Sequence, residues 1–116
     1  MAGTTNIKKF YEGQPGTTAT TLYTAPANTT NQPSPYATAI IKEILICNTT
    51  SSAATITIGI NGTAAANQIV GTLSVAGNDT KILTGIDTCL SAGDTIQALQ
   101  GTASAITLLI SGVEVQ

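Results

Sequence analysis

An alternating run of Ile and Thr near the middle of the chain constrains the fold more than any other feature. Between residues 54 and 60, Ile56, Ile58 and Ile60 take every second position, and Thr55 and Thr57 stand between them. Successive side chains of a strand point to opposite faces, so this order predicts a strand with one buried face and one wet face. Both residue types are β-branched and suit a pleated sheet. With 22 Thr and 14 Ile among 116 residues, the whole chain is predicted to be built from such strands.

Weaker alternation predicts further strands on both sides of this run. Their expected ranges are 18–24, 37–47, 69–75, 80–86, 95–99 and 106–113. The phase shifts near Lys42 and Glu43, which predicts a β-bulge, and Ala64 to Gln68 suits one helical turn. Turn signals recur about every ten residues, a spacing typical of an antiparallel sandwich or barrel.

The predicted fold is therefore all-β: an antiparallel, jelly-roll-like β-sandwich of about seven or eight strands. The length suits one domain, which we assign to residues 17–116. Residues 1–16 lack alternation and contain Gly13, Pro15 and Gly16, so we expect an extended N-terminal arm. Residues 25–36 hold three of the four Pro residues and are expected to form a long loop.

The low charge and the absence of His argue against several classes of function. Only 9% of residues are charged, the net charge is −2, and the four basic residues are all Lys. Four Lys residues neutralise few phosphates, which argues against a nucleic-acid partner. No His is present to serve as catalytic base or metal ligand. We expect a non-enzymatic protein without cofactor or metal.

The chain also carries no recognisable targeting signal. No apolar run approaches the roughly 20 residues of a membrane span, and the first residues lack the apolar segment of a signal peptide. We expect synthesis in a cytoplasm and no membrane partner. Cys47 and Cys89 are expected to stay reduced in that compartment, with a disulfide left open in case the strands bring them together.

The acidic residues offer no clear active site. Most lie in predicted turns or at strand ends, where a solvated carboxylate is expected; they are Glu12, Glu43, Asp79, Asp87, Asp94 and Glu114. The three aspartates among them, Asp79, Asp87 and Asp94, would form a calcium site only if their loops converged.

The aromatic residues gather in the first third of the chain: Phe10, Tyr11, Tyr23 and Tyr36. One interpretation is that they pack on one end of the sandwich. Another is that the arm and the loop carry them onto a neighbouring subunit, where aromatic anchors are favoured. On this second view Phe10, Tyr11 and Tyr36 are the candidate partner contacts. A surface with so little charge is typical of a protein largely covered by partners.

Four segments resemble small virion proteins of tailed bacteriophages. They are TLYTAPA at 21–27, AIIKEILICNT at 39–49, AATITI at 53–58 and LSAGDTI at 90–96. The resemblance extends over about residues 20–112, and the proline-rich stretch at 31–35 departs from it. It implies a β-sandwich protein that decorates capsids or belongs to a tail or fibre assembly, commonly as a trimer.

The resemblance therefore implies a capsid decoration or cement protein, a homotrimer that binds the outside of the shell and stabilises it. Its partners would be the major capsid protein or other virion proteins. It would be made in the bacterial cytoplasm and reside in the virion. Residues 4–16 and 25–36 would clamp neighbouring capsid subunits. Two alternatives stay open: a tail, neck or fibre-base component, and a carbohydrate-binding β-sandwich module.

Overall fold

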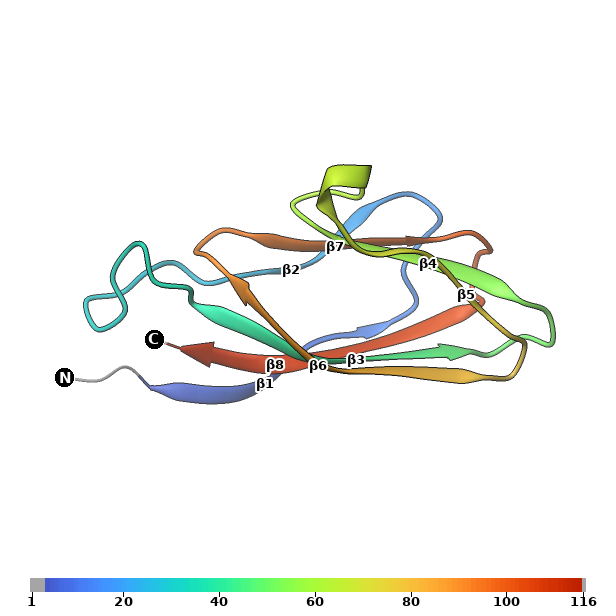
Figure 1. The fold of residues 1–116 in the computed structure, drawn as a ribbon, viewed down its shortest axis with the longest axis horizontal. Coiled ribbons are helices and arrows are strands. Elements are labelled where there is room, and N and C mark those ends of the chain that lie inside the picture. Colours follow the sequence, from blue (N-terminus) through green and yellow to red (C-terminus); the bar gives the residue numbers. More distant parts are fainter. Residues whose placement is uncertain (1–3, 116) are drawn as a thin grey trace.

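The computed structural model describes residues 4–115, and these form two antiparallel four-stranded sheets stacked on each other (Figure 1). The strands are β1 (Thr5–Gly13), β2 (Thr20–Thr24), β3 (Ala39–Asn48), β4 (Ala54–Ile60), β5 (Gln68–Val75), β6 (Thr80–Leu90), β7 (Thr95–Gln100) and β8 (Ile106–Val115). One 3₁₀ turn, η1 (Ala65–Asn67), precedes β5. The predicted all-β antiparallel fold is confirmed.

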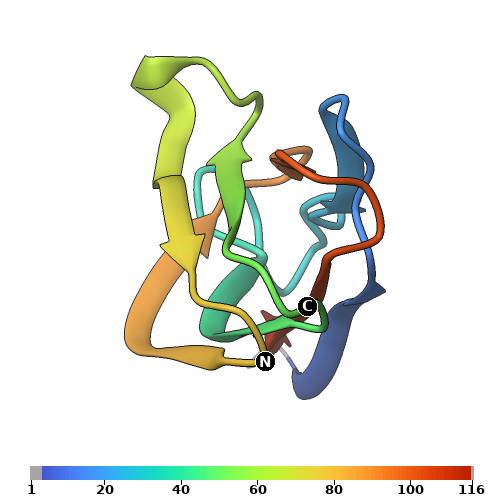
Figure 2. The same cartoon turned by 90° about the vertical axis from the view of Figure 1, so that its right-hand side faces the viewer.

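The strands pair as nested partners along the chain. β1 pairs with β8, β2 with β7, β3 with β6 and β4 with β5. One sheet, called sheet A here, has the order β1-β8-β3-β6, and the other, sheet B, has the order β2-β7-β4-β5. Figure 2 shows the two layers from one end, with the chain crossing repeatedly between them. Two antiparallel four-stranded sheets joined in this way form a β-sandwich.

The core lies between the sheets and consists mainly of Ile. Along β8 the residues alternate between buried and half-buried from Ile106 to Val115, as the period of a strand requires. Side chains from both sheets are fully enclosed there; the largest aliphatic ones are Ile41, Ile44, Ile46, Ile56, Ile58, Leu90, Ile96, Ile106, Leu108 and Ile110.

Several local predictions are confirmed. β4 has the predicted bounds, and β3 shows the expected bulge, a register shift between Ile41 and Glu43. β6 is longer than predicted and runs to Leu90. Its alternation is broken at Gly85 and Asp87, which have positive φ angles of 68° and 47°, yet its pairing with β3 resumes beyond this bend.

The N-terminal segment differs from the expected arm. Residues 5–13 form β1, the edge strand of sheet A, which pairs with β8 from Thr5–Val115 to Gly13–Leu108. A register shift between Lys9 and Tyr11 interrupts the alternation and turns Phe10 into the core, so the sequence pattern hides the strand. The sandwich therefore begins at β1 and not at residue 17. Residues 1–3 of the predicted arm lie outside the described residues.

Candidate interaction surface

The outer face of sheet A carries a transverse row of apolar side chains. Ile7 on β1 is opposite Val113 on β8, Val113 is opposite Ile40 on β3, and Ile40 is opposite Cys89 on β6. Directly opposed residues in a sheet share one face. We call these four residues the first apolar row.

Two further rows cross the same face. Lys9, Ser111, Glu43 and Thr84 form a polar row by the same register. Leu109, Leu45 and Ile82 form a second apolar row, with Glu12 at its β1 end. Along the strand direction, the face thus carries an apolar row, a polar row and a second apolar row.

This face is open to solvent along its length. No other segment of the described chain covers it (Figure 1). Ile7 is 92% exposed and Ile82 is 57% exposed, while Leu45, Leu109 and Val113 are half-buried by their neighbours in the sheet. Large apolar side chains gathered on one exposed face mark an interaction site more often than scattered ones do.

The outer face of sheet B has a different character. Its outward positions are mostly Thr, Gln and Ser, with Leu99 as an exception; they include Thr21, Thr55, Ser74 and Gln97. Ile69 on β5, at 38% exposure, is the large aliphatic side chain of sheet B that is open to solvent among the described residues. The outer face of sheet B is therefore more polar than that of sheet A. We take the outer face of sheet A as the candidate interaction surface.

The three predicted contact residues, Phe10, Tyr11 and Tyr36, differ in their exposure to solvent. Phe10 is only 6% exposed, and its ring stacks on Tyr23 with the centroids 4.2 Å apart. Tyr11 is half-buried and packs against the core, whereas Tyr36 is 60% exposed. Phe10 is therefore a core residue, as the end-packing interpretation expected, and it is not a free contact residue in this fold. Of the three, Tyr36 keeps an open ring.

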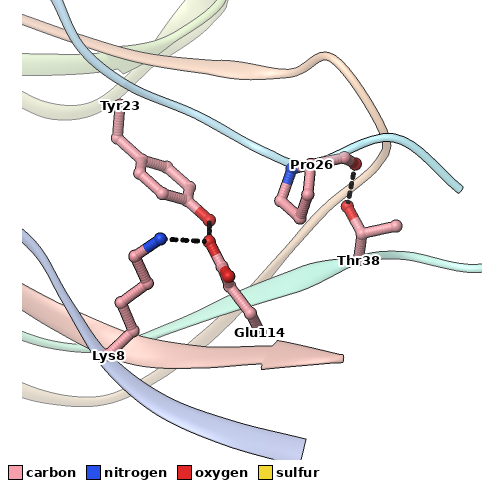
Figure 3. Close-up of polar contacts among 5 residues, drawn as sticks. All are labelled: Lys8, Tyr23, Pro26, Thr38 and Glu114. Atoms are coloured by element: carbon pink, nitrogen blue, oxygen red, sulfur yellow. Dashed lines mark hydrogen bonds and ion pairs between the residues drawn. The ribbon is translucent and has the colours of Figure 1, made fainter. Parts of the chain in front are cut away.

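The loop that carries Tyr36 is held by hydrogen bonds. Asn28 Nδ2 donates to the backbone oxygens of Gln32 and Tyr36, at 3.0 Å each. Thr38 Oγ1 donates to the Pro26 oxygen at 2.7 Å and ties the loop to the start of β3 (Figure 3). The loop projects from the end of the sandwich where β1 begins and β8 ends (Figure 1).

A partly buried polar cluster fastens β1 to both sheets (Figure 3). One oxygen of Glu114, on β8, accepts hydrogen bonds from Lys8 Nζ at 3.1 Å and from the hydroxyl of Tyr23 on β2. Lys8 Nζ also lies 5.9 Å from the centroid of the Tyr23 ring, within the range of a cation–π contact. Glu114 is 7% exposed. The cluster closes the sandwich on the side where β1 and β2 are the edge strands, and so holds Ile7 of β1 in the outer face of sheet A.

The protonation states of this cluster follow from its contacts. Burial favours the neutral form of Glu114, but hydrogen bonds from Tyr23 and Lys8 and the Lys8 charge outweigh it, so the pKa of Glu114 is lowered. Burial, then the hydrogen bond and charge of Glu114, raise the pKa of Tyr23 far above its ordinary 10.0. At neutral pH the Glu114 carboxylate therefore stays ionised and the Tyr23 phenol stays protonated, which are the states that their hydrogen bond requires. The burial of Glu114 does not follow from the sequence, because a carboxylate at the end of a strand is expected to be solvated.

Other candidate sites do not assemble in the part of the chain that the structure describes. Cys47 and Cys89 are free thiols, so the disulfide left open is not formed. Among residues 4–115 no three acidic, Cys or His side chains lie together as metal ligands, and no pocket is present. No helix in this range is long and apolar enough to cross a membrane.

Comparison with known proteins found no matching family model, no matching curated protein and no matching solved structure.

Proposed function

We propose that the chain is a non-enzymatic structural protein of a tailed-phage virion, and specifically a capsid decoration protein that binds the outside of the shell and stabilises it. The apolar outer face of sheet A carries this proposal. Fully burying an Ile side chain contributes about 1.5–3 kcal/mol, and Ile7 and Ile82 are left 92% and 57% exposed. A face of this kind suits a protein that works by association, and the four segments resembling virion proteins point to the same class.

The charges of the chain support association through apolar contact. Three of the four Lys residues already form ion pairs within the chain: Lys8 with Glu114, Lys9 with Glu12, and Lys42 with Asp87. Little unpaired positive charge remains to attract an acidic partner from a distance. Many weak contacts repeated over a shell would add up through multivalency, and each subunit bridged adds interface that heat or expansion must break.

Binding to empty shells tests this proposal. Capsid shells assembled from the major capsid protein of the same phage genome, without this chain, are incubated with the purified protein and sedimented. We expect saturable co-sedimentation and a higher temperature of shell disruption. Absence of binding at concentrations up to about 100 μM, near an affinity of only −5.5 kcal/mol, contradicts the decoration proposal.

The alternative place in the virion is the tail, neck or fibre base. The same apolar face would serve there. Copy number distinguishes the two places, because decoration proteins occupy a shell in hundreds of copies and tail parts in a handful to dozens.

A further inference from the structure

We infer that the outer face of sheet A is an interface between two copies of this chain, packed face to face about a two-fold axis that runs parallel to the strands between β8 and β3. This inference concerns the free protein. The dimer covers the face assigned above to shell binding, so the two contacts compete and binding to a shell through this face requires the dimer to dissociate. The dimer differs from the trimer that the resemblance implies, and the two give different masses in solution.

The size of the face suits a specific dimer. Sheet A contains four strands of nine to eleven residues. With strands about 4.8 Å apart and about 3.3 Å per residue, the face measures roughly 600 Å². Two copies would bury about 1,200 Å², which is at the lower end for specific protein interfaces.

The charges select the direction of the axis. An axis parallel to the strands reverses the strand order, so each row meets the same row of the other copy. It brings Lys9, which also pairs with Glu12 of its own chain at 2.6 Å, within about one strand spacing of Glu43 of the partner subunit, and the reverse contact forms by symmetry. The two Glu43 side chains come equally near each other, so two attractive contacts oppose one repulsive contact. A two-fold axis along the polar row would instead place Lys9 against Lys9 and Glu43 against Glu43, which is repulsive.

The central positions of the apolar rows fit the same arrangement, while at the rim Ile82 faces Glu12 of the partner subunit. With the axis between β8 and β3, Val113 faces Ile40 of the partner subunit, and Leu109 faces Leu45 of the partner subunit. The other basic residue of the face, Lys42, is neutralised by Asp87, whose Oδ1 lies 2.8 Å from its Nζ. The centre of the interface is therefore apolar on both sides, with the complementary charges between the two apolar rows.

The sheet edges are poorly suited to joining two copies. β1 has a register shift at Lys9, and β2 is only five residues long with a register shift between Thr21 and Tyr23. β5 pairs irregularly and contains Thr72 with a φ of 47°. β6 bends at Gly85 and Asp87. Bulges and bends twist an edge strand away from a partner and prevent strand addition. The open face, and not an edge, is therefore the surface available for self-association.

Sedimentation velocity on the full chain tests the inference, with two matched variants. Ile7 and Tyr36 are both large, exposed apolar side chains, but only Ile7 lies in the face. Because two Ile7 side chains leave water in one dimer, Ile7→Ser is expected to raise the dissociation constant about 100-fold, whereas Tyr36→Ser leaves it unchanged. At 92% exposure Ile7 contributes little to folding. A monomer, a trimer, or a dimer insensitive to Ile7→Ser overturns the inference.

A charge exchange tests the direction of the axis. Lys9→Glu and Glu43→Lys should each weaken the dimer, and the two changes together should restore it toward the wild-type affinity. A double variant as weak as the single ones overturns the parallel axis. All these masses are measured without capsids, so failure here leaves the decoration proposal intact, and failure of shell binding leaves the dimer intact.

Cross-linking locates the contact directly. In a Cys47→Ser, Cys89→Ser background, Ser111→Cys places a thiol next to the axis, and a short bis-maleimide should join two copies through it. Ser74→Cys is the matched control, because Ser74 is an exposed residue of β5 in sheet B. Equal cross-linking of the two variants, or none with Ser111→Cys, contradicts the proposed interface.

Discussion

Removing one hydroxyl from the Lys8–Tyr23–Glu114 cluster tests how β1 is held. Tyr23→Phe deletes the hydrogen bond to Glu114 and leaves the ring, so the stacking on Phe10 at 4.2 Å is retained. The carboxylate keeps Lys8 as a partner at 3.1 Å. A hydrogen bond to a charged group contributes about 1.5–3 kcal/mol, so we expect the free energy of unfolding to fall by about 2 kcal/mol.

Urea unfolding at pH 7 measures this loss. The midpoint should fall while the m-value stays the same, since the variant exposes the same surface on unfolding. Tyr11→Phe is the control, because Tyr11 packs against the core on the same strand as Lys8 but belongs to no such cluster. A Tyr23→Phe loss below about 0.5 kcal/mol, or equal to that of Tyr11→Phe, refutes the role given to the hydroxyl.

The same variant has a predicted pH dependence. The pKa of Glu114 is lowered in the folded protein, so the stability it contributes is complete above its unfolded pKa of about 4.3 and is lost as pH falls through the folded pKa. Tyr23 supplies part of that lowering, so Tyr23→Phe should lose less stability than the wild type between about pH 5 and pH 3. A steeper acid loss in the variant contradicts this sign.

Three further predictions concern single positions. Asn48→Ala should cost about 3 kcal/mol in urea unfolding, because this buried side chain donates to two backbone oxygens at 2.8 and 2.9 Å and accepts from a backbone N–H at 2.9 Å. Gly112→Ala should destabilise strongly, since an added Cβ would lie 2.0 Å from a backbone oxygen of β3, whereas Gly16→Ala, with its nearest atoms at 3.9 Å, should be tolerated. At a dilution where the protein is monomeric, Ellman's reagent should titrate two free thiols, with exposed Cys89 reacting faster than half-buried Cys47; a single fast thiol or none would be contrary to the structure.

The parts of the fold that the sequence predicted were those with local, regular signals. The Ile and Thr alternation of β4 needs no information from elsewhere in the chain, and the bulge of β3 shows as a phase shift at Lys42 and Glu43. β1 was not predicted as a strand, because its register shift at Lys9 points Phe10 into the core out of phase with the alternation. An edge strand with an interrupted period resembles an irregular segment.

The candidate surface depends on pairings that local patterns do not reveal. Ile7 and Val113 lie 106 positions apart, and their alignment with Ile40 follows from the strand order of sheet A. The sequence predicted which residues of β8 face each way, but not which strands flank it. Likewise, the hydrogen bonds of buried Glu114 come from Lys8 and Tyr23, which lie far from it in the sequence.

The copy number of the chain in purified phage particles tests the functional account most directly. Quantitative mass spectrometry against an isotope-labelled peptide standard, with the major capsid protein as reference, gives the number per particle. The account predicts hundreds of copies, lost together with shell stability when the gene is deleted. A handful to dozens of copies would place the protein in the tail, and its absence from particles would contradict a structural role in the virion.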